Sequence, residues 1–207
     1  MDVLSHGLWG GVVFGRENKR AFLCAVAFSV LPDLLSEGVL LLLVLLGAEG
    51  MPKFEGRHPN ITEFPGYAQG FYDFTHSLVA FGLVSAAVCL LLRRIFRPLL
   101  AWGLHILIDI PTHSVALFPT PFLWPVSDFK INGIGWASPV ILVPDIALLI
   151  VVYAIWVVRN AAGKSRACLR WAQPSSWPRW FGFRGVRRRS WWLVRKIRKI
   201  TSFVPPR

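Results

Sequence analysis

The chain has 207 residues, 54% of them hydrophobic, and a mean hydropathy of +0.50. The length allows one domain with a tail, and the apolar content is too high for a typical water-soluble domain. The formal net charge of +12 at pH 7 is confined to the C-terminal end, so it does not characterise the rest of the chain.

Four apolar segments are long enough to be predicted as transmembrane helices, which need about 20 residues. They cover residues 21–48, 76–92, 99–118 and 139–158. A shorter, glycine-rich apolar segment at residues 4–14 is predicted to be a re-entrant or interfacial helix. The predicted fold class is therefore an all-α integral membrane protein with about four transmembrane helices, a short N-terminal helix and a basic C-terminal tail.

The positions of Lys and Arg predict the orientation of these helices, because basic residues stay on the cytoplasmic side. Basic residues cluster at 16–20 and 93–97 and from Arg159 onward. With four crossings, all three clusters fall on one side of the membrane. We therefore expect a multi-pass protein of the cell (inner) membrane with both termini in the cytoplasm, and with the loops at 49–75 and 119–138 outside.

The composition changes sharply at Arg159. From there to the end the chain has 14 Lys or Arg and no Asp or Glu, whereas the preceding residues have 9 basic and 11 acidic side chains. We expect a transmembrane domain at residues 1–158 and a basic, Trp-rich cytoplasmic tail at residues 159–207. The favoured partners of this tail are anionic lipid headgroups, which attract basic segments near a membrane, and nucleic acid is the less favoured alternative.

Ionisable side chains inside predicted spans are energetically costly and therefore indicate functional sites. Those away from the span ends are Asp33, His105, Asp109, His113 and Asp145. His76 begins the second span and is preceded by Asp73, and His6 lies in the short N-terminal helix.

The segment HILIDIPTH places three of these residues on one helix face, because His105, Asp109 and His113 follow one another at intervals of four. Pro111 is predicted to kink the helix near Asp109. Imidazole nitrogens and carboxylate oxygens together suit zinc or manganese. A hydrogen-bonded polar network without metal, or a proton or ion pathway that includes Asp145, remain alternatives.

Two further residues extend this hypothesis to other helices. Pro32 is predicted to interrupt the first span and to turn Asp33 away from the helix axis, either into solvent or toward the third span. His76 stands where a helix begins. Thr75 or Asp73 can cap that helix, and a cap does not require a histidine.

Five short motifs occur in order over about two thirds of the chain: LSHGLWG, LPDLL, FTHSLV, HILIDIPTH and PTPFLWP. This ordered set resembles the bacterial membrane-bound metal-dependent hydrolase (YdjM-like) family. The family pattern has an N-terminal His, an LPD motif, a THS motif, an HxxxDxxT motif and a Pro–Leu–Trp–Pro segment. The resemblance implies a multi-pass membrane hydrolase. By ligand order it also implies a distant similarity to zinc-dependent phospholipase C and related zinc nucleases.

Carried over residue by residue, the resemblance implies the metal ligands His6, Asp33, His76, His105 and Asp109. His113 lies where many family members have proline, but it suits the later histidine of the phospholipase pattern. Leu34 and Leu35 replace polar residues of the family pattern, and Phe71 replaces a histidine. We therefore expect one or two metal ions rather than three.

The function we expect is metal-dependent hydrolysis of a phosphoester, with a lipid as the favoured substrate, by a membrane-embedded site. Zinc is the favoured metal and manganese the alternative, and Asp33 or Asp73 is the expected base. We expect the loop with Trp124, Lys130 and Trp136 to border the entrance, with the two tryptophans serving mainly as membrane anchors. The alternatives are a non-catalytic ion or proton pathway, a metal-binding scaffold, or a membrane-tethered nucleic-acid binder.

Overall fold

The computed structural model describes residues 1–50, 64–116 and 118–171, and side chains as far as Ala161. The predicted tail lies largely outside these residues. The chain divides into the units Met1–Arg159 and Asn160–Arg207, and the first carries every predicted site residue.

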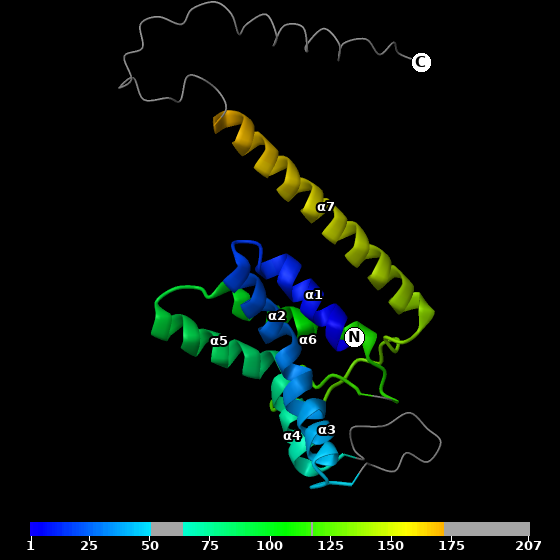
Figure 1. Ribbon diagram of the computed structural model, residues 1–207. Helices are drawn as coiled ribbons and strands as arrows, with labels where there is room; N and C mark the ends of the chain where they lie inside the picture. Colours follow the sequence, from blue (N-terminus) through cyan, green and yellow to red (C-terminus); the bar gives the residue numbers. More distant parts are fainter. Residues whose placement is uncertain (51–63, 117, 172–207) are drawn as a thin grey trace, which may run out of the picture. The chain divides into compact units, whose positions relative to one another are not determined.

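All regular elements of the described ranges are helical, as predicted (Figure 1). In chain order they are α1 (Val3–Phe14), α2 (Lys19–Asp33), the π turn η1 (Leu34–Gly38), α3 (Val39–Leu45), α4 (Gly66–Thr75), α5 (Leu78–Leu92), the 3₁₀ turn η3 (Arg97–Leu99), α6 (Leu100–Thr112) and α7 (Pro139–Trp171).

Helix α1 is buried against α2. Asp2 caps its N-terminus by accepting a hydrogen bond from the Ser5 backbone N–H at 3.0 Å. Gly10 permits the close approach of the two helices, since a Cβ atom there would lie 2.5 Å from the Cβ of Ser29. The Ser29 hydroxyl donates to the backbone oxygen of His6 at 2.6 Å. These contacts fix the position of His6 within the fold.

The first predicted span is confirmed as an apolar helix long enough to cross a membrane, covering Lys19–Leu45. Pro32 does not break it. The chain instead passes through the π turn η1, where the Ser36 hydroxyl donates to the carbonyl of Pro32 at 3.0 Å. Single π turns inside α-helices are frequent at functional sites. Here the wider turn directly follows Asp33, which is the last residue of α2.

The second predicted span, residues 76–92, corresponds to α5, which follows α4 after a sharp bend. Helices α4 and α5 meet at an angle of 64°, and together they have the length and apolar composition of a broken span or a re-entrant loop. The break falls at His76 and Ser77. The hydroxyl of Ser77 caps α5 by accepting hydrogen bonds from the backbone N–H groups of Val79 and Ala80.

The third predicted span, residues 99–118, is much shorter in the structure. Helix α6 has 13 residues and ends at Thr112, and His113 is already extended. Pro111 stands in its last turn, so the helix ends where the sequence predicted a kink and a continuation. Gly133 then packs against this end, its N–H donating to the His113 carbonyl at 2.9 Å. A Cβ atom at Gly133 would lie 2.3 Å from the Pro111 carbonyl oxygen, so glycine is required there.

The fourth predicted span is confirmed as a candidate span, Pro139–Ala161 within α7. Among the described residues, two helices are therefore long and apolar enough to cross a membrane, or three if α4 and α5 together form one span. The predicted total of four is not confirmed, because α6 is too short and α4 and α5 are bent.

Asp145 attaches α7 to α1. Its side chain is 6% exposed, and its two oxygens accept hydrogen bonds from the Ser5 hydroxyl and the Trp9 indole N–H, each at 2.7 Å. The Tyr153 hydroxyl adds a bond to the Leu8 carbonyl at 2.9 Å. The carboxylate is thus bonded to two neutral donors of α1 and serves as a link between the helices.

Two basic turns lie at the same end of the first unit. Arg97, which begins η3, forms an ion pair of 2.9 Å with Glu17, in the turn between α1 and α2.

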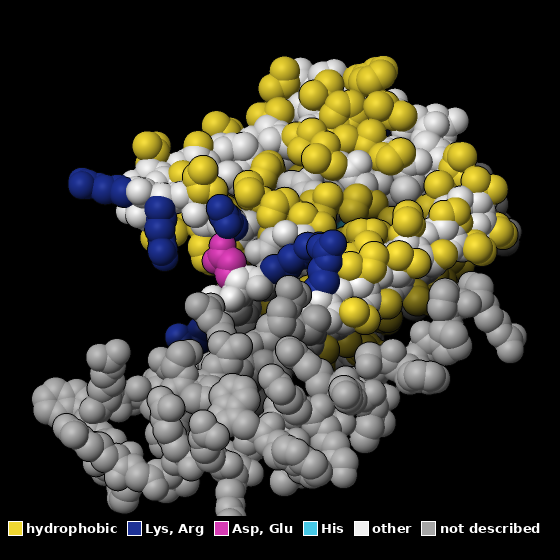
Figure 2. Space-filling view, turned by 90° about the horizontal axis from the view of Figure 1, so that it is seen from above, with side chains coloured by type: hydrophobic (Ala, Val, Ile, Leu, Met, Phe, Trp, Pro, Cys, Tyr) yellow, Lys and Arg dark blue, Asp and Glu magenta, His cyan; other side chains and the backbone are white. Residues whose placement is uncertain are grey.

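Figure 2 shows hydrophobic side chains exposed over much of the face viewed, with Lys and Arg gathered in one part of it. Exposed apolar residues such as Leu90 and Leu91, 78% and 83% accessible, are typical of a surface that faces lipid.

Candidate metal centre

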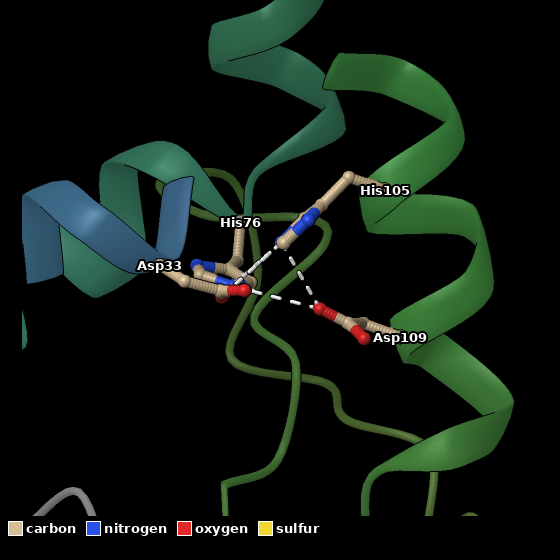
Figure 3. Close-up of side chains that lie close together, drawn as sticks. All are labelled: Asp33, His76, His105 and Asp109. Carbon is tan, nitrogen blue, oxygen red and sulfur yellow. Dashed lines mark hydrogen bonds and ion pairs between the residues drawn. The ribbon is translucent and has the colours of Figure 1, made fainter. Parts of the chain in front are cut away.

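Four of the predicted site residues converge on one point in the core of the first unit: Asp33, His76, His105 and Asp109. Asp33 comes from the end of α2, His76 from the break between α4 and α5, and the other two from α6 (Figure 3). One nitrogen or oxygen atom of each lies within 4.8 Å of those of the other three, and all four residues are buried. This Asp–His–His–Asp group, here called the metal group, can hold a metal ion.

One atom of each residue faces the centre of the metal group: Nε2 of His76 and His105, Oδ1 of Asp33 and Oδ2 of Asp109. His76 Nε2 lies 3.1 Å from His105 Nε2, 3.4 Å from Asp33 Oδ1 and 3.6 Å from Asp109 Oδ2. His105 Nε2 lies 3.5 Å from that Asp33 oxygen and 3.1 Å from that Asp109 oxygen. A tetrahedral zinc ion bonded at about 2.0–2.1 Å separates its ligand atoms by about 3.3–3.4 Å. The observed distances lie on either side of this value.

Unpaired polar atoms also indicate that the metal group is built for a cation. Among the described residues, Asp33 Oδ2, Asp109 Oδ2 and His105 Nδ1 are buried without a hydrogen-bond partner. Buried polar atoms are rarely left unpaired in folded proteins. A cation bound between the carboxylates compensates Asp109 Oδ2 directly, so the residues present fit a metal ion.

The orientation of His76 is fixed by the end of α4. Its Nδ1 atom lies 3.1 Å from the carbonyl of Tyr72, and the Tyr72 ring stacks on the imidazole at 4.0 Å between centroids. A proton on Nδ1 donates to that carbonyl and leaves the lone pair of Nε2 directed at the metal group. Trp102 holds the same turn by donating its indole N–H to the Thr75 carbonyl at 2.6 Å.

Asp109 connects the metal group, through its second oxygen, with an outer layer formed by His6 and His113. Oδ2 faces His76 and His105, whereas Oδ1 lies 2.9 Å from His6 Nε2 and 3.3 Å from His113 Nδ1. The terminal ammonium of Met1 also contacts Oδ1. His6 and His113, predicted as ligands, thus lie behind Asp109. Outer partners of this kind orient metal-binding side chains.

His6 supports a second member of the metal group as well. Its ring packs against His105 with centroids 3.8 Å apart, and it is fully buried. His113 no longer continues the helix face of His105 and Asp109, because α6 has ended one residue earlier.

The remaining predicted site residues lie elsewhere. Asp73, the alternative base, is half-buried on α4 and outside the metal group, and its charged neighbours include Lys130. Asp145 is bonded to α1, as described above. Neither Asp73 nor Asp145 is a member of the metal group, although Asp73 is close enough to His76 for their charges to interact.

A cavity of about 760 Å³ reaches the metal group at Asp33 and His76. Trp136 and the neighbouring residues Gly135 and Ser138 also line it, so the loop before α7 borders the site. Glu37, which was not predicted as a site residue, also lines this cavity. Its spacing of four from Asp33 was the available signal, since such residues share a helix face.

Asp2 also lines the cavity, near the start of α1. Burial opposes its ionisation, but hydrogen bonds with Ser5 outweigh that effect and hold the pKa of the carboxyl below its usual range. Asp2 is therefore a carboxylate at neutral pH.

Comparison of the chain with protein-family models, with curated proteins and with solved structures finds no match in any of the three. The resemblance to the membrane-bound hydrolase family thus remains a prediction from motifs. The functional argument depends on the geometry of the site.

Proposed function

We propose that the chain is a membrane-embedded, metal-dependent hydrolase that acts on a phosphoester, with a membrane lipid as its substrate. Asp33, His76, His105 and Asp109 hold the metal, which we propose to be zinc, with manganese as the alternative. The observation that carries this proposal is the convergence of four ligand atoms beside a cavity that Asp33 and His76 line. Two nitrogen and two oxygen donors suit both metals.

Access from the cavity favours a catalytic role. A structural zinc site is closed by four protein ligands, whereas a catalytic site keeps a position for water or substrate. Asp33 and His76 belong both to the metal group and to the cavity wall, and the Asp33 side chain is the most exposed of the four at 11%. When bound, a divalent metal supplies Lewis acidity and makes a coordinated water more acidic.

The chain's own residues account for positioning and proton transfer. His6 and His113 hold the outer oxygen of Asp109, which keeps the inner oxygen directed at the centre. Asp33 has a second oxygen without a hydrogen-bond partner among the described residues. Asp33 and Glu37 both line the cavity, and their carboxyl oxygens are the groups we propose to accept a proton.

We also propose the orientation in the membrane. The basic turns at 16–20 and 93–97 lie at one end, joined by the Glu17–Arg97 ion pair, and this end is proposed to face the cytoplasm. Asp33 lies near the middle of the Lys19–Leu45 helix. The cavity, lined by residues of the loop proposed to be external, then connects the buried site with the outer surface.

The four-residue ligand set also fits the second candidate function, a non-catalytic metal-binding scaffold, because closed sites have four protein ligands. An ion or proton pathway is less well supported. Asp145, the residue that would extend such a path, is bonded to Ser5 and Trp9 of α1.

Metal analysis of detergent-purified protein tests the proposal. We expect about one zinc or manganese ion per chain in the wild type, strong loss in His105→Ala and Asp109→Ala, and retention in Asp145→Asn, a matched buried carboxylate outside the metal group. Release of phosphate or alcohol from phospholipid vesicles is then measured with and without chelator. A wild-type protein without bound metal refutes the proposal.

Substitution of cobalt for the native metal separates the hydrolase from the scaffold. An open site changes its visible absorption spectrum when phosphate is added, because phosphate enters the coordination sphere. A closed four-ligand site gives a tetrahedral spectrum that phosphate leaves unchanged. Metal binding with the second result favours the scaffold.

A further inference from the structure

A second cavity, here called the apolar groove, lies close to the metal group but is separate from it. Its volume is about 370 Å³, and residues of α2, α4, α5 and α6 line it, among them Pro32, Thr75 and Trp102. Pro32 and Thr75 directly precede Asp33 and His76 in the chain. The groove nevertheless shares no lining residue with the cavity beside the metal group, so it is a distinct site of the size of a ligand pocket.

The described residues that line the apolar groove offer no free polar group to an occupant. The hydroxyl of Thr75 donates to the Phe71 carbonyl at 2.8 Å, within α4. The indole N–H of Trp102 donates to the Thr75 carbonyl at 2.6 Å. The other lining side chains are hydrocarbon. A polar molecule would lose its hydrogen bonds with water here without replacement, so the groove suits an apolar occupant.

The apolar groove is elongated and open at the protein surface. Val84, Val88 and Leu92 of α5 line it at intervals of four residues, and together they extend about 12 Å along the helix axis. Leu31 and Leu92 line the groove and are exposed. An elongated hydrocarbon surface, open at the side of a unit with candidate membrane spans, fits the acyl chain of a lipid.

Basic side chains stand at one end of this groove. Arg93 and Arg94 directly follow Leu92, and both are exposed and form no ion pair with another described residue, whereas Arg97 is paired with Glu17. Lys and Arg side chains lie next to exposed hydrophobic ones in this part of the surface (Figure 2). Basic residues beside an apolar site at the membrane boundary complement a lipid with an anionic headgroup.

The backbone of Arg93 gives independent support for a binding role. Arg93 ends α5 in the left-handed conformation, with φ 50° and ψ 30°, and it is the one non-glycine residue with positive φ among those described. Glycine is the usual residue at such a helix end, because a side chain disfavours this conformation. Strained positions of this kind cluster at ligand-binding sites. An arginine here is better explained by what its guanidinium binds than by the turn itself.

We propose that the apolar groove binds one acyl chain of an anionic phospholipid, such as phosphatidylglycerol, whose headgroup is held by Arg93 and Arg94. The inference does not depend on the proposed hydrolase activity, because the groove and the cavity beside the metal group are lined by different residues. The basic tail is a less suitable occupant, since Arg93 and Arg94 repel a segment of their own charge.

Photo-crosslinking in lipid nanodiscs tests this inference, because it locates the bound lipid. Full-length protein is reconstituted in phosphatidylcholine with a small fraction of a probe lipid that carries a photoactivatable group in one acyl chain, and cross-linked peptides are mapped by mass spectrometry. The probe has either a phosphatidylglycerol or a phosphatidylcholine headgroup. We expect the anionic probe to label the groove, at residues 28–35 and 84–92, roughly fivefold or more above the zwitterionic probe, the factor for one basic residue near anionic lipid. A chelator leaves this preference unchanged.

Three variants separate the headgroup contact from the groove. Arg93→Gly combined with Arg94→Gln removes the preference without lowering thermal stability, because glycine suits the left-handed turn. Val88→Trp fills the groove and removes its labelling by either probe. Arg159→Gln, which replaces an exposed arginine of α7 outside the groove, is the matched control and retains the preference.

Equal labelling of the groove by both probes in the wild type, or an unchanged preference in the double arginine variant, overturns the inference. Loss of the preference with chelator also overturns it, because the lipid is then bound through the metal centre. Cross-links from the groove to the tail in place of lipid identify the tail as the occupant and likewise overturn it. The double arginine variant leaves the groove lining intact, so it decides the question even if Val88→Trp does not fold.

Discussion

Replacing His6 with alanine distinguishes an outer position from direct metal binding. The resemblance implied that His6 is a ligand, but its Nε2 lies 2.9 Å from Asp109 Oδ1, on the side away from the metal group. Loss of an outer partner of a ligand typically lowers metal affinity by about 10–100-fold. We expect His6→Ala to fall in this range, which corresponds to about 1.4–2.8 kcal/mol. The contact of His113 with the same oxygen at 3.3 Å prevents a complete loss.

The assay is competition between the purified protein and a chromophoric chelator, with His105→Ala and Asp145→Asn measured beside His6→Ala. We expect His105→Ala to lose metal almost completely and Asp145→Asn to match the wild type. If His6→Ala loses as much metal as His105→Ala, His6 is a ligand and its placement here is wrong. If the metal affinity of His6→Ala equals that of the wild type, His6 does not support Asp109 in metal binding, and the predicted loss of affinity is refuted.

Two further predictions concern the fold. In a Cys-free background, single cysteines at Gly56 and Asn132 should react with a membrane-impermeant reagent in intact cells, and a cysteine at Arg94 should react only after permeabilisation. Labelling of all three from outside indicates two crossings, whereas labelling of only one of the first two contradicts the proposed orientation. Asp145→Ala should lower the unfolding free energy in detergent by about 1–3 kcal/mol, because Ser5 and Trp9 lose their acceptor. Asp145→Asn should cost less, and equal stability of Asp145→Ala and wild type would show that the link to α1 contributes nothing.

The sequence was most informative where site residues share one helix. His105 and Asp109 are four residues apart, and the structure places both on the buried face of α6. Local helical periodicity is enough to predict this arrangement. The same argument failed for His113, because it assumed that the helix continues. Pro111 and the packing of Gly133 on the helix end terminate α6 first, so His113 lies on extended chain.

Convergence between helices could not be derived from spacing. Asp33 reaches the metal group from the end of α2, directly before a π turn, and His76 reaches it from a 64° break between helices. Neither the π turn nor the break has a clear local signature in the sequence. The order of the motifs named both residues as candidate ligands without indicating how they meet. The predicted total of four spans is not confirmed for a related reason: apolar length predicts that a helix can cross, whereas tertiary contacts decide where it bends or stops.

The distinction between ligand and support is the feature that composition and spacing were least able to provide. Four histidines lie in apolar segments, and each has the same chemistry. The structure separates them by the oxygen of Asp109 that they face: His76 and His105 lie near Oδ2, and His6 and His113 near Oδ1. A carboxylate with one inner and one outer oxygen allows a single residue to connect two layers of a site. Asp109 is therefore the residue whose replacement should disturb both layers at once.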